Sequence, residues 1–308
     1  MPPQIPPELH DSEQQSASAG SVPDLSNPAV VRRLLQKHGA RPQKTFGQYW
    51  LEDREALRRI VEAAELTPGA SALEVGAGMG VLTVALAQAV GPEGRVIAVE
   101  IERDVLAILR EVTEPLGNVE ILPRNLLEVE PRDLFQGAPY ALVANLPYYI
   151  TASALRHFLE CDQPPQRLVV LVQQEVAERM TAKPGALSLL GVSVQFYGQA
   201  QLIARVPASS FYPPPRVDSA VVRVDVYPEP PLAQGVEERE RFFQVVRAGF
   251  SQKRKTLRNS LALGLDQPPA MVEAWLRAAN IDPQRRAETL ALEEWGRLAQ
   301  VVGSEQAK

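Results

Sequence analysis

The sequence predicts an open α/β sheet, mostly parallel, followed by a separate helical segment. Three observations support this fold class. Short apolar strand patterns alternate with helical patterns from residue 71 onward. A glycine-rich turn joins the first of these strands to a helix. Beyond Pro231 the apolar residues recur at helical spacing, which predicts helices over 237–250, 255–263, 269–280 and 290–302. Strands that alternate with helices are typical of a parallel sheet.

Composition narrows the class of protein. The 308 residues include one cysteine, Cys161, and three histidines. They therefore exclude an intramolecular disulfide and disfavour a zinc or histidine-based site. No apolar run reaches membrane-spanning length, and the first residues lack the basic and apolar regions of a secretory signal. We expect a cytoplasmic protein whose residues 1–27, rich in Pro, Ser, Gln and acids, form a disordered tail.

The net charge of −5 is unusual for a protein that binds nucleic acid, but the basic residues are clustered. Residues 31–48 and 242–265 each contain five basic residues and no acidic ones. One such patch is typical of a solvated helix face, whereas two on an acidic chain favour contact with phosphates. The second patch consists of Arg247, Lys253, Arg254, Lys255 and Arg258.

The first strand-turn-helix unit indicates a nucleoside site. A helical pattern starts at Asp53 and ends before Pro68; the strand that follows leads into a G-x-G-x-G turn and a helix over 81–90. Glycines let the backbone approach a ligand closely. The strand over 95–99 ends in Glu100, which is placed to accept hydrogen bonds from both ribose hydroxyls of a nucleoside. Asn125 follows the strand over 119–122 and can bond an adenine amino group. A dinucleotide site is the structural alternative, although its third glycine is absent here.

The stretch Asn145-Leu146-Pro147-Tyr148 ends a predicted buried strand over 140–144. Pro147 turns the backbone out of the sheet, at the edge where ligands bind in open α/β sheets. The side-chain oxygen of Asn145 and the carbonyl of Leu146 can both accept from an exocyclic amine and orient its lone pair. Tyr148 can stack on the ring that carries this amine. An ordinary Asn-Pro turn is the alternative interpretation.

These motifs together resemble the rRNA adenine N6,N6-dimethyltransferase family, and most closely its bacterial small-subunit branch. The shared segments are KTFGQYWLED, LEVGAGMGVLT, VIAVEIERD, VANLPYYI, LVQQEVAERM, FYPPPRVDSAVVRV and RKTLRNSL, in the family's order. The resemblance implies a class I (Rossmann-like) methyltransferase fold with a seven-stranded, mostly parallel sheet and a small C-terminal helical domain. It also implies S-adenosylmethionine as methyl donor, no metal, and 16S rRNA in an immature 30S subunit as substrate, with two adjacent adenosines of the 3′-terminal hairpin loop as targets.

The resemblance also assigns roles to individual residues. Asn145, Leu146 and Tyr148 hold the target adenine, and Phe211 supplies a second ring face. The implied cofactor residues are Tyr49, Leu51, Glu74, Gly76, Gly78, Glu100, Asn125 and Asn145. Two positions depart from the family: Asn125 stands where Asp is usual, and Tyr49 stands where an Asn contacts the cofactor. The role of Tyr49 is therefore open.

The predicted organisation is a tail over 1–27, a catalytic domain over 28–230 and an RNA-binding helical domain over 231–308, in a protein expected to be a monomer. Glu175 and Glu178 are alternative catalytic carboxylates. A structural role at the helix start is favoured for Glu175 and a solvated position for Glu178, because methyl transfer to an amine needs no strong base. Three other functions stay open: a large-subunit adenine dimethyltransferase, a ribosome-assembly factor that acts by binding, and a small-molecule N-methyltransferase.

Overall fold

A seven-stranded sheet forms the centre of the protein. The computed structural model describes residues 22–41 and 49–306. The strands lie in the order β4-β3-β2-β5-β6-β9-β7. Only β9 runs antiparallel to its neighbours. The bounds are β2 Ser71–Val75, β3 Arg95–Val99, β4 Val119–Leu122, β5 Ala141–Asn145, β6 Arg167–Gln173, β7 Gly198–Val206 and β9 Ser219–Val226. The expected seven strands, mostly parallel, are confirmed.

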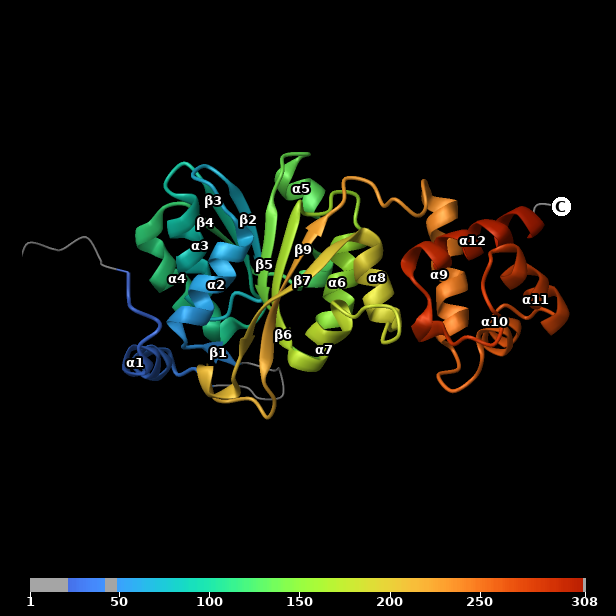
Figure 1. Ribbon diagram of the computed structural model, residues 1–308. Helices are drawn as coiled ribbons and strands as arrows, with labels where there is room; N and C mark the ends of the chain where they lie inside the picture. Colours follow the sequence, from blue (N-terminus) through green and yellow to red (C-terminus); the bar gives the residue numbers. More distant parts are fainter. Residues whose placement is uncertain (1–21, 42–48, 307–308) are drawn as a thin grey trace, which may run out of the picture.

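Helices cover both faces of this sheet (Figure 1). Residues of β5 alternate between two apolar clusters: Val143 packs with helices α2 and α3, whereas Leu142 and Ala144 pack with α6, α7 and α8. This alternation follows from the two-residue period of a strand. The helices are α1 Pro28–His38, α2 Arg54–Ala64, α3 Val81–Val90, α4 Arg103–Thr113, α5 Pro131–Phe135, α6 Thr151–Glu160, α7 Gln174–Met180 and α8 Leu189–Tyr197.

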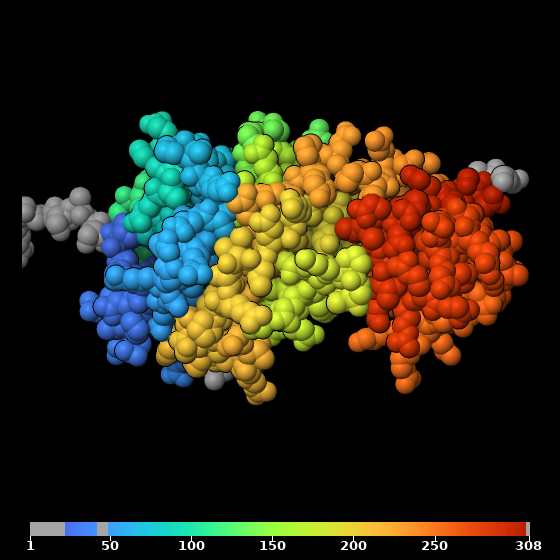
Figure 2. All heavy atoms as spheres, in the orientation of Figure 1, coloured from blue at the N-terminus to red at the C-terminus, as the bar shows by residue number. Residues whose placement is uncertain are grey.

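Four further helices form the end of the chain: α9 Val236–Phe250, α10 Leu257–Gly264, α11 Pro269–Ala278 and α12 Leu292–Gln306. They make the red and orange lobe at one end of the molecule, opposite the blue N-terminal residues (Figure 2). Trp275 and Trp295 are both buried in this lobe, as their helical spacing predicts. The predicted helices agree with the observed ones to within a few residues.

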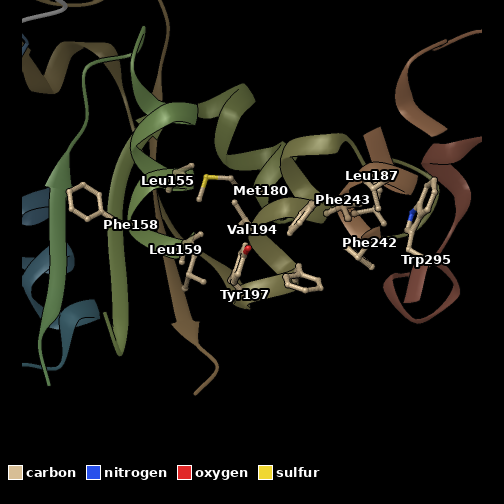
Figure 3. Close-up of a cluster of buried hydrophobic side chains, with 14 of the residues drawn as sticks. Leu155, Phe158, Leu159, Met180, Leu187, Val194, Tyr197, Phe242, Phe243 and Trp295 are labelled. Atoms are coloured by element: carbon tan, nitrogen blue, oxygen red, sulfur yellow. The ribbon is translucent and has the colours of Figure 1, made fainter. Parts of the chain in front are cut away.

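The lobe shares an apolar core with the sheet domain. Phe242 of α9 packs on Phe196 of α8, with ring centroids 4.5 Å apart. Phe243 stacks on Tyr197 at 5.8 Å. Figure 3 shows this continuous layer of side chains between α8 and the lobe. The predicted domain boundary at residue 231 therefore lies where the chain enters a lobe that packs tightly on the sheet domain.

A two-stranded ribbon joins distant parts of the chain beneath the large sheet. Strand β1 (Trp50–Leu51) pairs antiparallel with β8 (Phe211–Tyr212). Asp53 caps α2 by accepting from the amides of Glu55 and Ala56. The hydroxyl of Ser210 also donates to Asp53, at 2.7 Å, which fixes the start of α2 against β8.

The end of the predicted tail is ordered in part. Residues 1–21 lie outside the described residues. Leu25 is buried in a cluster with helix α1 and Trp50, and Asp24 forms an ion pair with Arg54 of α2. These contacts bring residues 24–26 into the packed structure, although the sequence assigned them to a disordered segment.

Candidate functional site

A cleft opens where β2, β3 and β5 end. The space between its walls, together with the open solvent at its mouth, is about 1030 Å³. The glycine-rich turn after β2 forms one wall. Gly76, Gly78 and Gly80 all have positive φ angles, of 75°, 56° and 93°. A Cβ atom on Gly78 would lie 3.2 Å from Nε1 of Trp50. Larger residues would therefore be strained here and would crowd the wall.

Glu100 stands at the tip of β3 with its carboxylate fixed by the backbone. Its Oε2 accepts from the amide of Gly78 at 2.7 Å. Its Oε1 accepts from the amides of Ile101 at 2.7 Å and Glu102 at 2.9 Å. The carboxylate thus connects the glycine turn with the end of β3. Its Oε2, which accepts one bond, keeps an acceptor site for a ligand hydroxyl, whereas Oε1 already accepts two. This is the placement that the sequence predicts for a ribose-binding acid.

Glu74 lies deeper, in β2, and also lines the cleft. Its side chain is only 2% exposed. In the described part of the chain its Oε2 has no hydrogen-bond partner. Burial, together with the nearby charge of Glu100, raises the pKa of Glu74 to about 8. An unpartnered buried oxygen beside a cleft is a site that a polar group of a ligand can satisfy.

Asn125 lines the same cleft beyond β4. Its side-chain oxygen accepts from the amide of Leu127 at 3.1 Å and so caps the short 3-10 helix Leu126–Glu128. The oxygen that the sequence assigned to an adenine amino group is therefore already engaged once. It retains one lone pair, while the amide nitrogen adds a donor that an aspartate would lack.

Asn145, the last residue of β5, has a defined amide orientation. Its Nδ2 donates to the backbone carbonyl of Tyr49 at 2.9 Å. Within the residues that the structure describes, Oδ1 of Asn145 accepts no hydrogen bond, and neither does the carbonyl of Leu146. Two consecutive residues where β5 leaves the sheet thus each keep an unoccupied acceptor. The first of them is next to the glycine turn, because a Cβ on Gly76 would lie 3.8 Å from the backbone carbonyl of Asn145.

Tyr148 follows, half-buried and held at two points. Its hydroxyl shares a 3.0 Å hydrogen bond with the buried hydroxyl of Ser219. Its ring stacks on that of Tyr49, with centroids 5.5 Å apart and planes at 27°. Burial raises the pKa of Tyr148. The phenol therefore stays neutral near pH 7, and its bond to Ser219 is maintained.

Phe211 and Leu51 face each other across the β1–β8 ribbon. Phe211 is only 3% exposed and packs in the cluster that contains Ile60 and Val221. It does not line the cleft, whereas Leu51 does. The part expected for Phe211, a second ring face for the target base, would require a rearrangement and stays a prediction.

The basic C-terminal residues divide into two groups. Lys253, Arg254 and Lys255 are exposed in the loop between α9 and α10. Arg258 instead forms an ion pair with Glu273 at 3.2 Å. In Figure 1 this orange loop lies at the lower edge of the molecule, on the same side as β1. The loop that carries the three cations thus lies on the same side of the molecule as β1, whose residues line the cleft. Of the first basic patch, residues 42–48, including Lys44, lie outside the described residues.

Residues 22–41 and 49–306 contain neither a candidate metal site nor a candidate membrane-spanning helix. There, no three or more His, Cys, Asp or Glu side chains are grouped as they would be to hold a metal ion. No helix in these ranges is long and apolar enough to cross a bilayer. The thiol of Cys161 has its pKa raised to about 11 by burial, so it is not a nucleophile at neutral pH.

The comparisons with known proteins agree with this geometry. A family model described as ribosomal RNA adenine dimethylase matches residues 39–302. The chain belongs to the ribosomal RNA adenine dimethylase family. A ribosomal RNA small subunit methyltransferase A from Dehalococcoides mccartyi is 44% identical, over 92% of this chain and 96% of that relative. The protein of the same name from Pelotomaculum thermopropionicum is 43% identical, over 89% and 96%.

Solved structures show the same fold. The crystal structure of the 23S rRNA methyltransferase ErmE matches with a TM-score of 0.66 and 29% identity, over 82% of this chain and 99% of that one. A dimethyladenosine transferase from Plasmodium falciparum matches with a TM-score of 0.69 and 21% identity, over 83% and 98%. The predicted class I methyltransferase fold and the enzyme class are confirmed for this ribosomal RNA adenine dimethylase.

The sequence motifs predicted most of the residues that line the cleft, but not all of them and not the hydrogen bond between Tyr49 and Asn145. Trp50 and the exposed ring of Tyr149 line the cleft together with the residues expected to bind the cofactor, whereas Leu146, Tyr148 and Phe211 are not among its lining residues. Trp50 and Tyr149 lie beside motif residues, so proximity in sequence was the available signal. The contact of Tyr49 with Asn145 joins residues 96 positions apart. Such pairing can be seen only once β1 is placed.

Proposed function

We propose that this enzyme uses S-adenosylmethionine to dimethylate the N6 amines of two adjacent adenosines in the 3′-terminal hairpin loop of 16S rRNA. The substrate would be an assembling small subunit in the cytoplasm, and the protein would act as a monomer. The pair of free acceptors on the consecutive residues Asn145 and Leu146 carries the proposal, because Asn145 lines the cleft beside the glycine turn, where an amine would face a methyl donor.

The residues present fit S-adenosylmethionine. Glu100 offers a fixed carboxylate to ribose hydroxyls, the glycine turn leaves space beside Trp50, and Asn125 offers polar atoms to an adenine. The orphaned oxygen of Glu74 faces the same cleft. When bound, S-adenosylmethionine supplies a sulfonium methyl group that is already activated for transfer.

The chain's own residues then orient the target. Oδ1 of Asn145 and the carbonyl of Leu146 accept hydrogen bonds from the two N6–H groups, which directs the nitrogen lone pair away from these oxygens. Tyr148 holds the base by stacking, and extrusion of an adenosine is least costly from a loop. After the nitrogen attacks, the proton leaves from an acidic ammonium, so no strong base is needed. Near-attack placement, with reacting atoms about 3–3.5 Å apart, supplies most of the rate.

The relatives support the small-subunit substrate. Proteins named for the small subunit are 44% and 43% identical to this chain. The 23S rRNA methyltransferase ErmE is 29% identical. Assay of undermethylated small subunits against protein-free 23S RNA separates the two substrates. Methyl transfer to 23S RNA alone would reverse the assignment.

Substitution of the central amide tests the pocket. Asn145→Ala removes the Oδ1 acceptor and should lower kcat roughly 100-fold or more while particle binding is retained. Asn145→Asp is the matched variant: it keeps acceptor oxygens but places charge against the carbonyl of Tyr49, so an intermediate loss is expected. Mapping of modified adenines with labelled S-adenosylmethionine is the measurement. Full methylation by Asn145→Ala would contradict the pocket assignment.

A different result would favour a binding factor. If Asn145→Ala abolishes methylation while particle binding and growth persist unchanged, the main task of the protein is association with the assembling subunit. If instead growth and ribosome assembly fail together with methylation, the modification itself is required. A small-molecule methyltransferase would turn over without any dependence on Lys253, Arg254 and Lys255.

A further inference from the structure

Tyr49 contacts both functional groups of the Asn-Leu-Pro-Tyr turn. Its backbone carbonyl accepts from Asn145 Nδ2 at 2.9 Å. Its ring stacks on Tyr148 with centroids 5.5 Å apart. Tyr49 also lines the cleft and packs against the cluster that contains Leu51 and Phe211. A single residue from the N-terminal side thus meets the two side chains that we assign to the target base.

The carbonyl of Tyr49 determines which amide atom of Asn145 remains available. A carbonyl oxygen accepts but cannot donate. If the amide were flipped, its oxygen would face the Tyr49 oxygen and the two acceptors would repel each other. The observed bond therefore directs the NH2 group toward Tyr49 and leaves Oδ1 for a ligand amine.

The ring of Tyr49 fixes the plane of Tyr148. Tyr148 is tethered through its hydroxyl to Ser219, which is fully buried in β9. A hydroxyl tether alone still permits the ring to turn about its long axis, whereas a stacked neighbour resists this rotation. Because Tyr49 covers one face of Tyr148, a base that stacks on Tyr148 must use the other face. A ring held in place before binding loses less entropy on stacking.

We propose that Tyr49 is a positioning residue for the target base: its ring braces Tyr148 and its carbonyl orients Asn145. This inference rests on the proposed function, because it assumes that Tyr148 stacks on an adenine. It assigns the side chain of Tyr49 to the base side of the cleft, although the corresponding family position is implied to contact the cofactor.

Three variants test this role. Tyr49→Ala removes the ring and keeps the carbonyl, Tyr49→Phe keeps both, and Tyr227→Ala removes an exposed ring elsewhere. Tyr227 follows the antiparallel strand β9. It therefore lies at the amino ends of the parallel strands, whereas the cleft lies at their carboxyl ends. Two quantities are measured: methylation kinetics on undermethylated small subunits, and the Kd for S-adenosylmethionine by calorimetry.

Loss of the ring should reduce kcat/KM for the RNA substrate roughly 2- to 10-fold, the effect expected for one aromatic pair. The cofactor Kd should change less than about 2-fold, because the ring is assigned to the base side of the cleft and Tyr49→Ala keeps the backbone. Tyr49→Phe should restore wild-type kinetics, and Tyr227→Ala should not differ from wild type. A weakened cofactor Kd with unaltered RNA kinetics, or unchanged kinetics in Tyr49→Ala, would overturn the inference.

A binding measurement separates this inference from the proposed substrate. An oligonucleotide with 2-aminopurine at the target position reports base stacking through fluorescence quenching, without methyl transfer. Wild-type protein should quench it, and Tyr49→Ala should quench it less. If wild-type protein quenches the probe but methylates no small-subunit adenine, the proposed substrate fails and the role of Tyr49 stands. Equal quenching by both proteins refutes the role of Tyr49.

Discussion

Replacement of the buried Glu74 by glutamine should remove a pH dependence from the stability of the protein. The carboxyl is 2% exposed, and burial raises its pKa from 4.5 to about 8. Between these two values the unfolded chain releases the proton and the folded chain retains it. The free energy of unfolding should therefore fall as pH rises through this window. Below it both states bind the proton, and above it neither does.

The magnitude follows from the two pKa values. Linkage gives a destabilisation of about 1 kcal/mol at pH 5 and roughly 4 kcal/mol at pH 8 from this group. Glu74→Gln does not titrate, so its stability relative to wild type should increase by about 3 kcal/mol across that range. A fixed cost or gain from the new amide is the same at every pH and does not affect this difference.

The assay is urea unfolding of both proteins at several pH values, followed by the fluorescence of the three tryptophans. Glu100, whose charge contributes to the raised pKa of Glu74, is present in both proteins. Stability curves that stay parallel from pH 5 to pH 8 would show that the folded protein does not hold a protonated Glu74. The account of its unpartnered oxygen would then be wrong.

Two further predictions concern the C-terminal lobe. Replacing Lys253, Arg254 and Lys255 by glutamine should weaken binding to small-subunit particles. The slope of log K against log salt should fall by about 2–3, because each phosphate contact contributes roughly 0.7–0.9. Arg58→Gln, in the ion-paired surface of α2, is the control, and an unchanged slope for the triple variant would exclude the loop from RNA contact. Gly249→Ala places a Cβ 2.4 Å from the buried ring of Trp295 and should destabilise the protein by about 1–3 kcal/mol in urea unfolding. Gly296→Ala, whose nearest contact is 3.3 Å from Leu232, should cost much less, and equal losses would contradict the steric argument.

The sequence predicted those parts of the fold that local pattern determines. The helix over 81–90 and the strands over 95–99 and 119–122 coincide with α3, β3 and β4, because glycines and alternating apolar runs mark their ends. The strand before Asn145 was placed one residue early, since Asn145 itself still pairs with Leu171. The seven-stranded sheet was implied by the family resemblance rather than by any pattern in the strands.

Contacts between segments that are distant in sequence could not be predicted from local patterns. The capping bond of Asn125 and the ion pair of Arg258 both engage side chains that the sequence treated as free for a ligand. The burial of Phe211 depends on the pairing of β8 with β1, which no local pattern encodes. The contacts of Leu25 likewise arise from packing on α1 rather than from composition.

The aromatic layer joining α8 to α9 has a consequence for the choice of substrate. Because Phe242 and Phe243 pack on Phe196 and Tyr197, helix α9 is held against the sheet domain, and the loop that follows it starts from a fixed point relative to the cleft. If this loop binds a phosphate, as proposed, the span between that phosphate and the modified adenine is set by the protein. An RNA would be modified only if its own tertiary structure already holds these two points at that separation, so recognition would depend on the folded state of the RNA more than on its base sequence.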